Sequence, residues 1–258
     1  MPKFAANLSF LFTEFDFYDR FEAAANAGFK GVEFHFPYDF EKTEIAERLD
    51  ANGLMQVLHN MPAGDWAAGE RGIACLPDKV GEFQDNVGLA IENAKVLGCF
   101  QVNCLSGVLP EGVARETAVD VLIHNLIFAS AEFKKASIRL LIEPINRFDV
   151  PGFLLNTSND GMSVIEAVGS DNLFLQYDIY HMQRMEGELA NTIDALLPKI
   201  AHMQIADTPG RHEPGTGEIN FDFLFNHIDS TTYDGWIGCE YVPRSSTVAG
   251  LAWMESCR

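Results

Sequence analysis

Eight short apolar runs alternate with helix-like runs along the 258 residues of the chain. No linker rich in Pro, Gly or Ser, no low-complexity tract and no abrupt change of composition divides them. Strands that are apolar almost throughout are typical of a parallel sheet covered by helices. These observations predict an α/β fold, a single (β/α)8 TIM barrel that takes residues 1–258 as one domain. An open doubly wound sheet is disfavoured, because no GxGxxG follows the first strand.

Each predicted strand is a short apolar run between turn or helix signals. Its last residues matter most, since barrel enzymes carry their active sites at the carboxyl ends of the strands. In chain order the predicted strands are Phe4–Phe10, Gly31–Phe36, Met55–Met61, Phe100–Leu105, Ile138–Glu143, Leu173–Asp178, Ile200–Gln204 and Trp236–Glu240.

The predicted helices have apolar residues at helical spacing and recognisable ends. We expect Gly28 and Gly53 to end the first two helices, and Thr43 and Ser158 to cap the second and the fifth. A longer loop, Pro62–Leu76, separates the third strand from its helix. The predicted helices are Phe15–Ala27, Glu44–Asn52, Pro77–Leu97, Arg115–Lys135, a helix from Ser158 to Val168, Glu188–Lys199, Phe221–Ile228 and a short closing helix, Ala249–Trp253.

The charge of the chain narrows the classes of partner. Eighteen Lys and Arg residues against 37 Asp and Glu residues give a net charge of −19. Nucleic-acid binding needs clustered basic residues, so we expect no nucleic-acid partner and no adsorption to an anionic membrane. A negatively charged substrate would therefore need positive charge supplied locally by the site.

The N-terminal sequence and the cysteines predict a cytoplasmic protein. MPKFAANLSF lacks the apolar stretch of a signal peptide. No run approaches the roughly 18 apolar residues of a membrane span. The five cysteines are odd in number and form no CxxC pair, which favours reduced thiols.

Four successive strands in the second half of the chain deliver a polar side chain near their ends. These are Glu143, Asp178, Gln204 and Glu240. Burying such a group is costly, so a run of four needs a reason. Taken singly, each has an ordinary structural explanation as an ion pair, a spacer or a turn cap. Together they predict one site whose oxygen donors suit a hard divalent ion, Mg²⁺ or else Mn²⁺.

Two carboxylates beside such an ion are what an enolisation requires. The ion stabilises the enediolate oxygen, one carboxylate removes the proton next to the carbonyl, and the other returns it to the neighbouring carbon. Glu143 and Glu240 come from strands three steps apart around the ring, so we expect them to flank the substrate as the acid/base pair. Asp178 and Gln204 would complete the coordination. Because the amide of Gln204 carries no charge, unlike a carboxylate, we expect metal binding to be weak or exchangeable.

Several other polar residues are candidates to contact the substrate. His181 lies one helical turn after Asp178, and Arg211 lies in the polar loop after the seventh strand. For Arg147 an ion pair with Glu143 is an equal alternative, and for His181 a structural role remains open. The full set of substrate-binding candidates is His59, Glu70, Arg71, Arg147, His181 and Arg211.

The chain also resembles the hydroxypyruvate isomerases of the xylose-isomerase-like barrel superfamily, over almost its full length. The stretches that carry the resemblance are FAANLSFLF, GVEFHFPYD, HNMPAGDWAAGERGIA, LLIEPINRFDVPGF, QYDIYHMQRMEGEL, HMQIAD, HEPGTGEIN and GWIGCEY. The resemblance implies interconversion of hydroxypyruvate and tartronate semialdehyde within glyoxylate metabolism. It also implies Glu143 and Glu240 as the acid/base pair, and these two with Asp178 and Gln204 as the metal positions.

Related activities remain open at this point. A 2-oxo-tetronate isomerase shares the strand-end residues, whereas ketose 3-epimerases usually have His where this chain has Gln204. The hydroxypyruvate isomerases often have Lys where this chain has Val242, so Arg71, Arg147 or Arg211 would have to hold the substrate carboxylate. A barrel endonuclease, a non-catalytic sugar-acid-binding protein, and a 1,2-hydride shift in place of proton transfer are further alternatives. The expected partner is a small hydroxy-keto acid, with a homo-oligomer left open.

Overall fold

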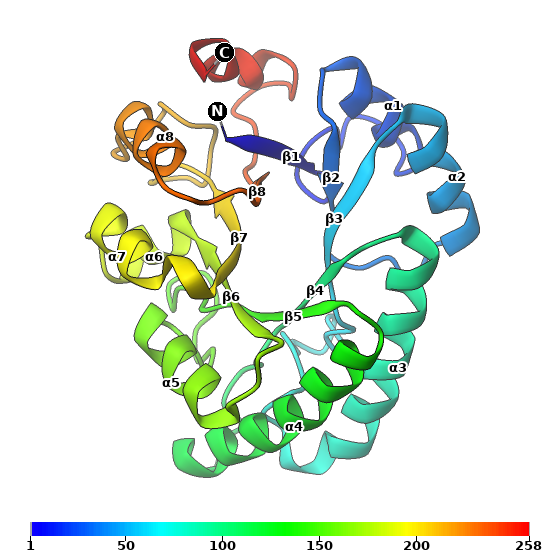
Figure 1. Cartoon of the computed structure of the whole chain (residues 1–258), viewed down its shortest axis with the longest axis vertical. Helices are drawn as coiled ribbons and strands as arrows, with labels where there is room; N and C mark the ends of the chain where they lie inside the picture. Colours follow the sequence, from blue (N-terminus) through cyan, green and yellow to red (C-terminus); the bar gives the residue numbers. More distant parts are fainter. Residues whose placement is uncertain (1, 258) are drawn as a thin grey trace.

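The computed structural model describes residues 2–257, in which eight parallel strands close into a barrel in chain order (Figure 1). The barrel closes where β1 pairs with β8. This confirms the predicted fold class. The strands are β1 (Lys3–Asn7), β2 (Gly31–Glu33), β3 (Met55–Asn60), β4 (Gln101–Cys104), β5 (Arg139–Ile142), β6 (Leu173–Asp178), β7 (Ile200–Ile205) and β8 (Trp236–Cys239).

Helices surround the strands, and the C-terminal segment lies close to the N-terminus (Figure 1). The ring of Phe4 in β1 meets that of Trp253, with centroids 4.9 Å apart, so the last segment packs against the first strand. The helices are α1 (Asp19–Asn26), α2 (Lys42–Asn52), α3 (Val80–Leu97), α4 (Arg115–Lys135), α5 (Ser158–Val168), α6 (Ile179–Met185), α7 (Leu189–Leu196) and α8 (Phe221–Ser230). The 3-10 segments are η1 (Pro77–Lys79), η2 (Leu197–Lys199) and η3 (Ala249–Cys257).

Two predicted helix caps are wrong. α2 begins at Lys42, before Thr43, and no side chain caps it. The N-cap of α5 is Thr157, whose hydroxyl accepts from the backbone N–H of Asp160 while the Asp160 carboxylate accepts from the backbone N–H of Thr157. This reciprocal pair is a capping box, which outweighs the single cap expected from Ser158. Gly53 ends α2 in the left-handed conformation, as expected.

The barrel has an apolar outer side, and its interior is polar near the carboxyl ends of the strands but apolar nearer their amino ends, where Ala5 and Leu141 lie in a second buried cluster. Its main apolar cluster joins strand residues such as Val32 and Ile142 to helix residues such as Leu122. In β4, the Asn103 amide donates to Asn60 in β3 and to Glu143, at 3.1 and 3.0 Å, so these three side chains point inward. Because side chains alternate along a strand, the residues next to them point outward to the helices.

Burial keeps three of the cysteines unreactive. Cys75, Cys99 and Cys104 are buried free thiols. Burial raises the pKa of Cys75 to about 11 and those of Cys99 and Cys104 to about 12. The side chain of Cys257 lies outside the described part of the chain. Within residues 2–257, none of the helices has the length and apolarity needed to cross a membrane.

Candidate active site

Three carboxylates meet at the carboxyl ends of the second-half strands. Glu143 follows β5, Asp178 ends β6, and Glu240 follows β8; each is at most 6% exposed. Burial and the charges of Glu240 and Asp178 raise the pKa of Glu143 well above its usual range. Burial also raises the pKa of Asp178, to about 7. The site therefore concentrates more acidic groups than the surrounding protein can readily keep ionised.

Arg211 is the cation that reaches these carboxylates. Its guanidinium bonds to the Glu240 carboxylate and lies 3.9 Å from Oδ2 of Asp178. Burial opposes the charge of Arg211, but Glu240 and Asp178 outweigh burial and raise its pKa. In the same way burial favours a neutral Glu240, but Arg211 and His35 lower the pKa of Glu240 to about 2. Arg211 thus provides positive charge at this site, which a negatively charged substrate would need in a chain with a net charge of −19.

The loop after β7 is built to present Arg211. Arg211 has a φ of 55°, a left-handed conformation that costs a non-glycine residue about 1 kcal/mol or more. Its carbonyl accepts from the backbone N–H of Val242, at 2.8 Å, which ties this loop to the one after β8. The buried carboxylate of Asp207 also organises the loop by accepting from four backbone N–H groups, those of Thr208, Gly215, Gly217 and Ile219. The sequence predicted Arg211 in this polar loop as a substrate contact, but gave no sign of the Asp207 hydrogen bonds that shape the loop.

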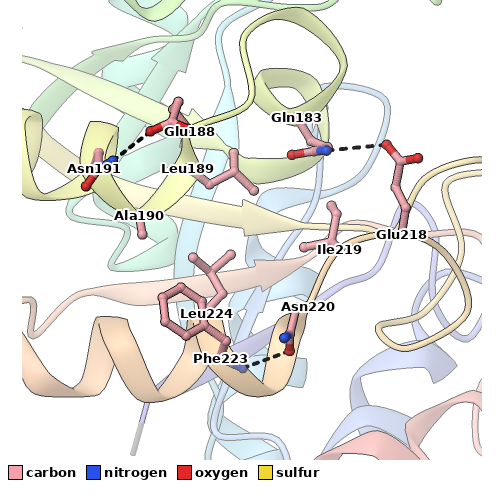
Figure 2. A pocket seen from close by; sticks show the side chains of 10 residues that line it. All are labelled: Gln183, Glu188, Leu189, Ala190, Asn191, Glu218, Ile219, Asn220, Phe223 and Leu224. Atoms are coloured by element: carbon pink, nitrogen blue, oxygen red, sulfur yellow. Dashed lines mark hydrogen bonds between the residues drawn. The ribbon is translucent and has the colours of Figure 1, made fainter.

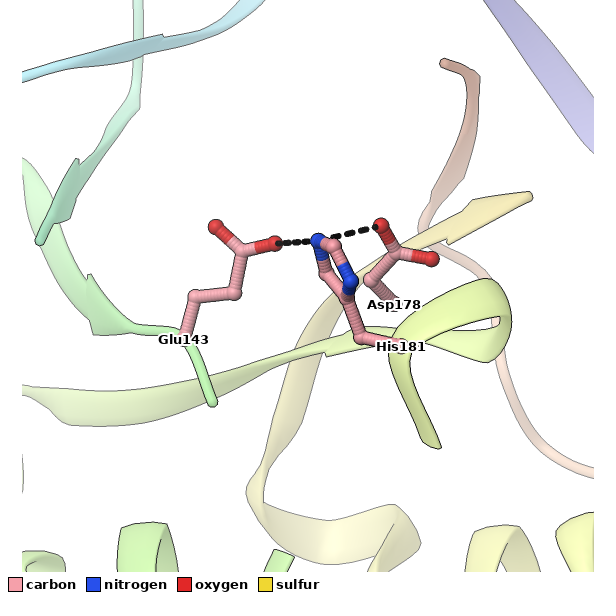
Figure 3. A group of neighbouring side chains, drawn as sticks. All are labelled: Glu143, Asp178 and His181. Carbon is pink, nitrogen blue, oxygen red and sulfur yellow. Dashed lines mark ion pairs between the residues drawn. The ribbon is translucent and has the colours of Figure 1, made fainter. Parts of the chain in front are cut away.

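His181 lies between two of the carboxylates, as Figure 3 shows. Its Nε2 is 3.4 Å from Oδ2 of Asp178 and 3.9 Å from Oε1 of Glu143. Asp178 caps α6 by accepting from the backbone N–H of Tyr180, and this places His181 in the first turn of the helix. Burial, and then the charge of Arg211, lower the pKa of His181 to about 3. His181 is therefore neutral at physiological pH.

Three buried side chains of the site could supply ligand atoms to a divalent cation. Glu143, Asp178 and His181 can each bring one ligand atom within 4.8 Å of the others. Oδ2 of Asp178 is buried and accepts no hydrogen bond from the described residues. A cation held there would relieve the crowding of acidic groups.

Gln204 lies beside Glu240, but its amide is turned the other way from the prediction. Its Nε2 donates to Glu33 Oε1, at 2.8 Å, and to Glu240. Its Oε1 accepts from Nε2 of Gln176, at 2.6 Å. Ionised carboxylates only accept, so the two glutamates fix this orientation. The oxygen that the sequence analysis assigned to a metal is already occupied.

Glu33 at the end of β2 is the buried residue that sequence reasoning missed. Besides Gln204, its carboxylate meets Nδ2 of Asn7 at 2.9 Å and Nε2 of His202 at 2.6 Å. A Cβ at position 238 would overlap this carboxylate, so Gly238 in β8 makes room for it. The signal was present in the sequence, because Glu33 interrupts the apolar run GVEF just as Glu143 interrupts its own.

Two predicted substrate contacts do not contact the carboxylates among the described residues. His59 pairs in register with Val102, next to the inward pair Asn60 and Asn103, so its ring points outward. It lies beside the ring of Tyr38, and burial lowers its pKa to about 4. Arg147 is exposed and makes no ion pair with Glu143 among the described contacts. Neither side chain joins the carboxylate cluster.

The Glu70–Arg71 pair stabilises the loop after β3 instead of contacting the cluster. Glu70 forms an ion pair with Lys79, at 2.7 Å. Arg71 stacks on Trp66, 3.9 Å from the ring centroid, and donates to the backbone carbonyls of Trp66 and Glu70. Of the predicted cations, Arg211 alone contacts the strand-end carboxylates within the described residues.

A separate groove lies between α7 and α8 (Figure 2). Leu189, Leu224 and Phe223 line it with apolar surface. Its two carboxylates, Glu188 and Glu218, bond to neighbouring amides and do not converge. The ten described residues of its lining include neither a cation nor a histidine. The groove therefore lacks the combination of carboxylates, histidine and arginine that lies at the carboxyl ends of the strands.

Comparison with known proteins places the chain in a family. The family described as xylose isomerase-like TIM barrel matches residues 21–257. The chain belongs to the xylose isomerase-like TIM barrel family. Within that family it is 54% identical to hydroxypyruvate isomerase of Escherichia coli K12, over 258 residues that cover all of both chains. It is 46% identical to 2-oxo-tetronate isomerase of Cupriavidus necator, over 99% of this chain and 98% of that one.

Solved structures support the barrel fold. A Brucella melitensis protein described as AP endonuclease, family 2, superposes with a TM-score of 0.97 and is 43% identical, with both chains fully covered. An L-ribulose 3-epimerase superposes with a TM-score of 0.77 at 24% identity, over 99% of this chain and 86% of that one. At that identity the second likeness supports the barrel and nothing finer.

Proposed function

We propose that this protein is a hydroxypyruvate isomerase, an intramolecular oxidoreductase that interconverts hydroxypyruvate and tartronate semialdehyde. One observation carries the proposal: the buried glutamates after β5 and β8, Glu143 and Glu240, converge with Arg211 at one end of the barrel. The 54% identity to the Escherichia coli hydroxypyruvate isomerase supports the choice of substrate. A cytoplasmic location and a role in glyoxylate metabolism belong to the same proposal.

The chemistry is a pair of proton transfers through an enediolate. One glutamate of the pair Glu143 and Glu240 removes a proton from C3 of hydroxypyruvate, and the C2 carbonyl becomes an enediolate oxygen. The other glutamate protonates C2 on the far side of the substrate. The O3 hydroxyl gives up its proton and becomes the aldehyde oxygen, while O2 gains one, so atoms and charge balance. In the reverse reaction the two glutamates exchange roles.

Arg211 and His181 are the groups that bind and orient the substrate. Arg211 matches the substrate carboxylate in charge and in fork geometry. It lies among Glu240, Asp178 and the rings of Phe10 and Tyr180, with its carbon 4.8 and 5.0 Å from the two ring centroids. His181 faces the space between Glu143 and Asp178, where a substrate oxygen would lie. Together these contacts would place the reacting carbons between the two glutamates.

A divalent ion, Mg²⁺ or Mn²⁺, fits this site. Glu143, Asp178 and Glu240 would hold it, and Gln204 would join them only with its amide turned. When bound, the ion supplies positive charge next to the developing enediolate oxygen. The unpartnered Oδ2 of Asp178 supports this assignment.

A 2-oxo-tetronate isomerase is the second candidate function. It is favoured by the 46% identity to the Cupriavidus necator protein of that name. The chemistry at Glu143 and Glu240 would be unchanged, and only the substrate would be one carbon longer. The ratio of kcat/KM on hydroxypyruvate to kcat/KM on 2-oxo-tetronate separates the two candidates. We expect a ratio above one.

A nuclease is disfavoured for this chain. A multi-zinc nuclease site needs several histidines and a basic groove. The one cluster of possible ligands found among residues 2–257 includes a single histidine, His181, and the chain has a net charge of −19. A ketose 3-epimerase is disfavoured as well. Such an enzyme usually has His where this chain has Gln204, and the Gln204 amide is already hydrogen-bonded to Gln176 and Glu33.

The test of the proposed function is a turnover assay with purified protein. Hydroxypyruvate is supplied with EDTA, with Mg²⁺ or with Mn²⁺, and tartronate semialdehyde is measured. We expect turnover that is lost in Glu143→Gln and in Glu240→Gln. Absence of turnover on hydroxypyruvate and on 2-oxo-tetronate under all three conditions would contradict the proposal. A hydride shift is recognised by a product that gains no deuterium in D₂O.

A further inference from the structure

Asn146, just after β5, makes a complete set of hydrogen bonds that ends on His181. The side chain is fully buried. Its Oδ1 accepts from the backbone N–H groups of Phe148 and Asp149, at 3.0 and 2.9 Å. Its Nδ2 lies 3.1 Å from Oδ2 of Asp149 and 2.6 Å from Nδ1 of His181.

These contacts leave one orientation for the Asn146 amide. The two backbone N–H groups can only donate, so the atom that faces them is the oxygen. The opposite atom is then the NH₂, and its two hydrogens meet Asp149 and His181. Asp149 is itself held by the hydroxyl of Tyr180, at 2.9 Å, and by Arg184. A flipped amide would face two backbone donors with its NH₂ and the carboxylate with its oxygen, so it is excluded.

The amide orientation determines the state of the His181 ring. An N–H donor that approaches Nδ1 at 2.6 Å requires a lone pair on that nitrogen. The ring is then neutral, and its one hydrogen is on Nε2. Nε2 is the nitrogen that faces the space between Glu143 and Asp178 (Figure 3).

We propose that Asn146 is a positioning residue that fixes His181 as the neutral Nε2–H tautomer, so that His181 donates a hydrogen bond to the reacting oxygen and does not bind a metal. A histidine that binds a metal through Nε2 must offer a lone pair there, and such a histidine commonly donates its other N–H to an acceptor. Here the other nitrogen faces a donor. Of the cluster Glu143, Asp178 and His181, the two carboxylates are left as metal ligands.

A neutral imidazole donor suits an enediolate intermediate. It stabilises charge on the substrate oxygen as that charge develops, and it gives no full positive charge that would repel a neighbouring cation. The catalytic consequence rests on the proposed function. The tautomer itself rests only on the contacts of Asn146, so the two can fail separately.

The test is the ¹⁵N NMR spectrum of the ring nitrogens in the full-length protein without substrate. His181 is assigned by comparison with His181→Gln. In the wild type we expect the pair of ring-nitrogen shifts of a neutral Nε2–H imidazole at pH 7. A His181 that is protonated, or that is the Nδ1–H tautomer, overturns the proposal. Turnover plays no part in this measurement, so a wrong substrate assignment would leave its outcome unchanged.

The matched variant is Asn146→Asp, which keeps the acceptor for Phe148 and Asp149 and replaces the NH₂ with an oxygen. With an acceptor opposite Nδ1, we expect His181 to change to the Nδ1–H form and kcat to fall by about 10²–10³-fold, as for loss of one oxyanion donor. Asn226→Asp makes the same change on the exposed face of α8. It should alter neither the His181 tautomer nor kcat. An unchanged His181 tautomer in N146D overturns the proposal.

A second variant covers the case in which N146D does not fold. Asn146→Ser removes the amide donor without adding a charge, and its shorter hydroxyl does not reach Nδ1 of His181. We expect a mixture of the two tautomers and a lower kcat with KM changed little. A pure Nε2–H ring in this variant overturns the role assigned to Asn146.

Discussion

The substitution Glu33→Gln tests whether the buried network beneath the site holds its catalytic end in place. Glu33 receives three hydrogen-bond partners, Asn7, Gln204 and His202, at 2.9, 2.8 and 2.6 Å. A glutamine keeps one acceptor oxygen, which can serve Asn7 and Gln204. Its NH₂ then faces Nε2 of His202. The ring can accept only by moving its proton to Nδ1, which is buried without a partner among the described residues.

Whichever way the network rearranges, one buried N–H group that had an acceptor is left without one. Such a loss costs about 1–3 kcal/mol. For a chain of this size each kcal/mol moves Tm by about 2–4 °C, so a central loss of about 2 kcal/mol lowers Tm by about 4–8 °C. Asn7 and Gln204 also donate to Glu240, so the change reaches the proposed acid/base pair. We expect kcat to fall by about 10–100-fold, as for loss of an outer-shell partner.

The assay is thermal unfolding with turnover on the same samples. Glu92→Gln is the control, because it makes the same change in an exposed ion pair with Lys42. An exposed pair is worth about 0.2–1 kcal/mol, so the Tm of this control should move by about 4 °C or less. If Glu33→Gln unfolds within about 1 °C of Glu92→Gln and turns over at the wild-type rate, the network does not have the role assigned to it.

Three further predictions follow from the site. Glu143→Gln and Glu240→Gln should each lower kcat by about 10²–10⁴-fold while the far-ultraviolet circular dichroism stays that of the folded protein; a near-wild-type rate in either removes that residue from the mechanism. Arg211→Met should raise KM at least tenfold, and Arg147→Ala should leave KM within about twofold; equal effects of the two would show that Arg211 does not bind the substrate carboxylate. Asp178, with a pKa raised to about 7, and Glu143, also raised, are protonated in the folded protein over a range where the unfolded chain is ionised, so the metal-free protein should lose stability as pH rises from about 4 to 7. The gain in Tm on adding Mg²⁺ or Mn²⁺ should accordingly be larger at pH 8 than at pH 5.5, and an equal gain at both would contradict these carboxylates as ligands.

The barrel and the strand-end acids could be predicted from sequence because both leave periodic signals. Apolar runs of strand length alternate with helical patterns, and a carboxylate near the end of such a run is conspicuous. Glu143, Asp178 and Glu240 were found in this way. Glu33 carries the same signal, but it lies in the first half of the chain, apart from the four successive strand ends of the second half.

The direction of individual side chains could not be predicted. His59 and Asn60 are adjacent polar residues, and a shift of one position decides which of them faces the barrel interior. The register between β2 and β3 shifts at Glu33, which pairs with Leu58, so counting alternate residues along β3 does not show which side chains face inward. The orientation of the Gln204 amide depends on partners from β2, β6 and β8, which only the closed barrel brings together.

Hydrogen bonding within loops also left no simple pattern. Arg71 and Arg211 are both loop arginines, and only the structure separates the one stacked on Trp66 from the one bonded to Glu240. The short helix α6 follows Asp178 without a break, because Asp178 both ends β6 and caps the helix. Its existence places His181, and the sequence indicated it only as one helical turn.

Conversion of hydroxypyruvate by the wild-type protein and by Glu240→Gln, followed by NMR in D₂O with Mg²⁺ present, tests the central claim most directly. A proton-transfer isomerase that uses Glu143 and Glu240 should give tartronate semialdehyde carrying deuterium at C2 in the wild type, and almost no product in the variant. A wild-type protein that forms no aldehyde, or a variant that forms it at the wild-type rate, would contradict the account.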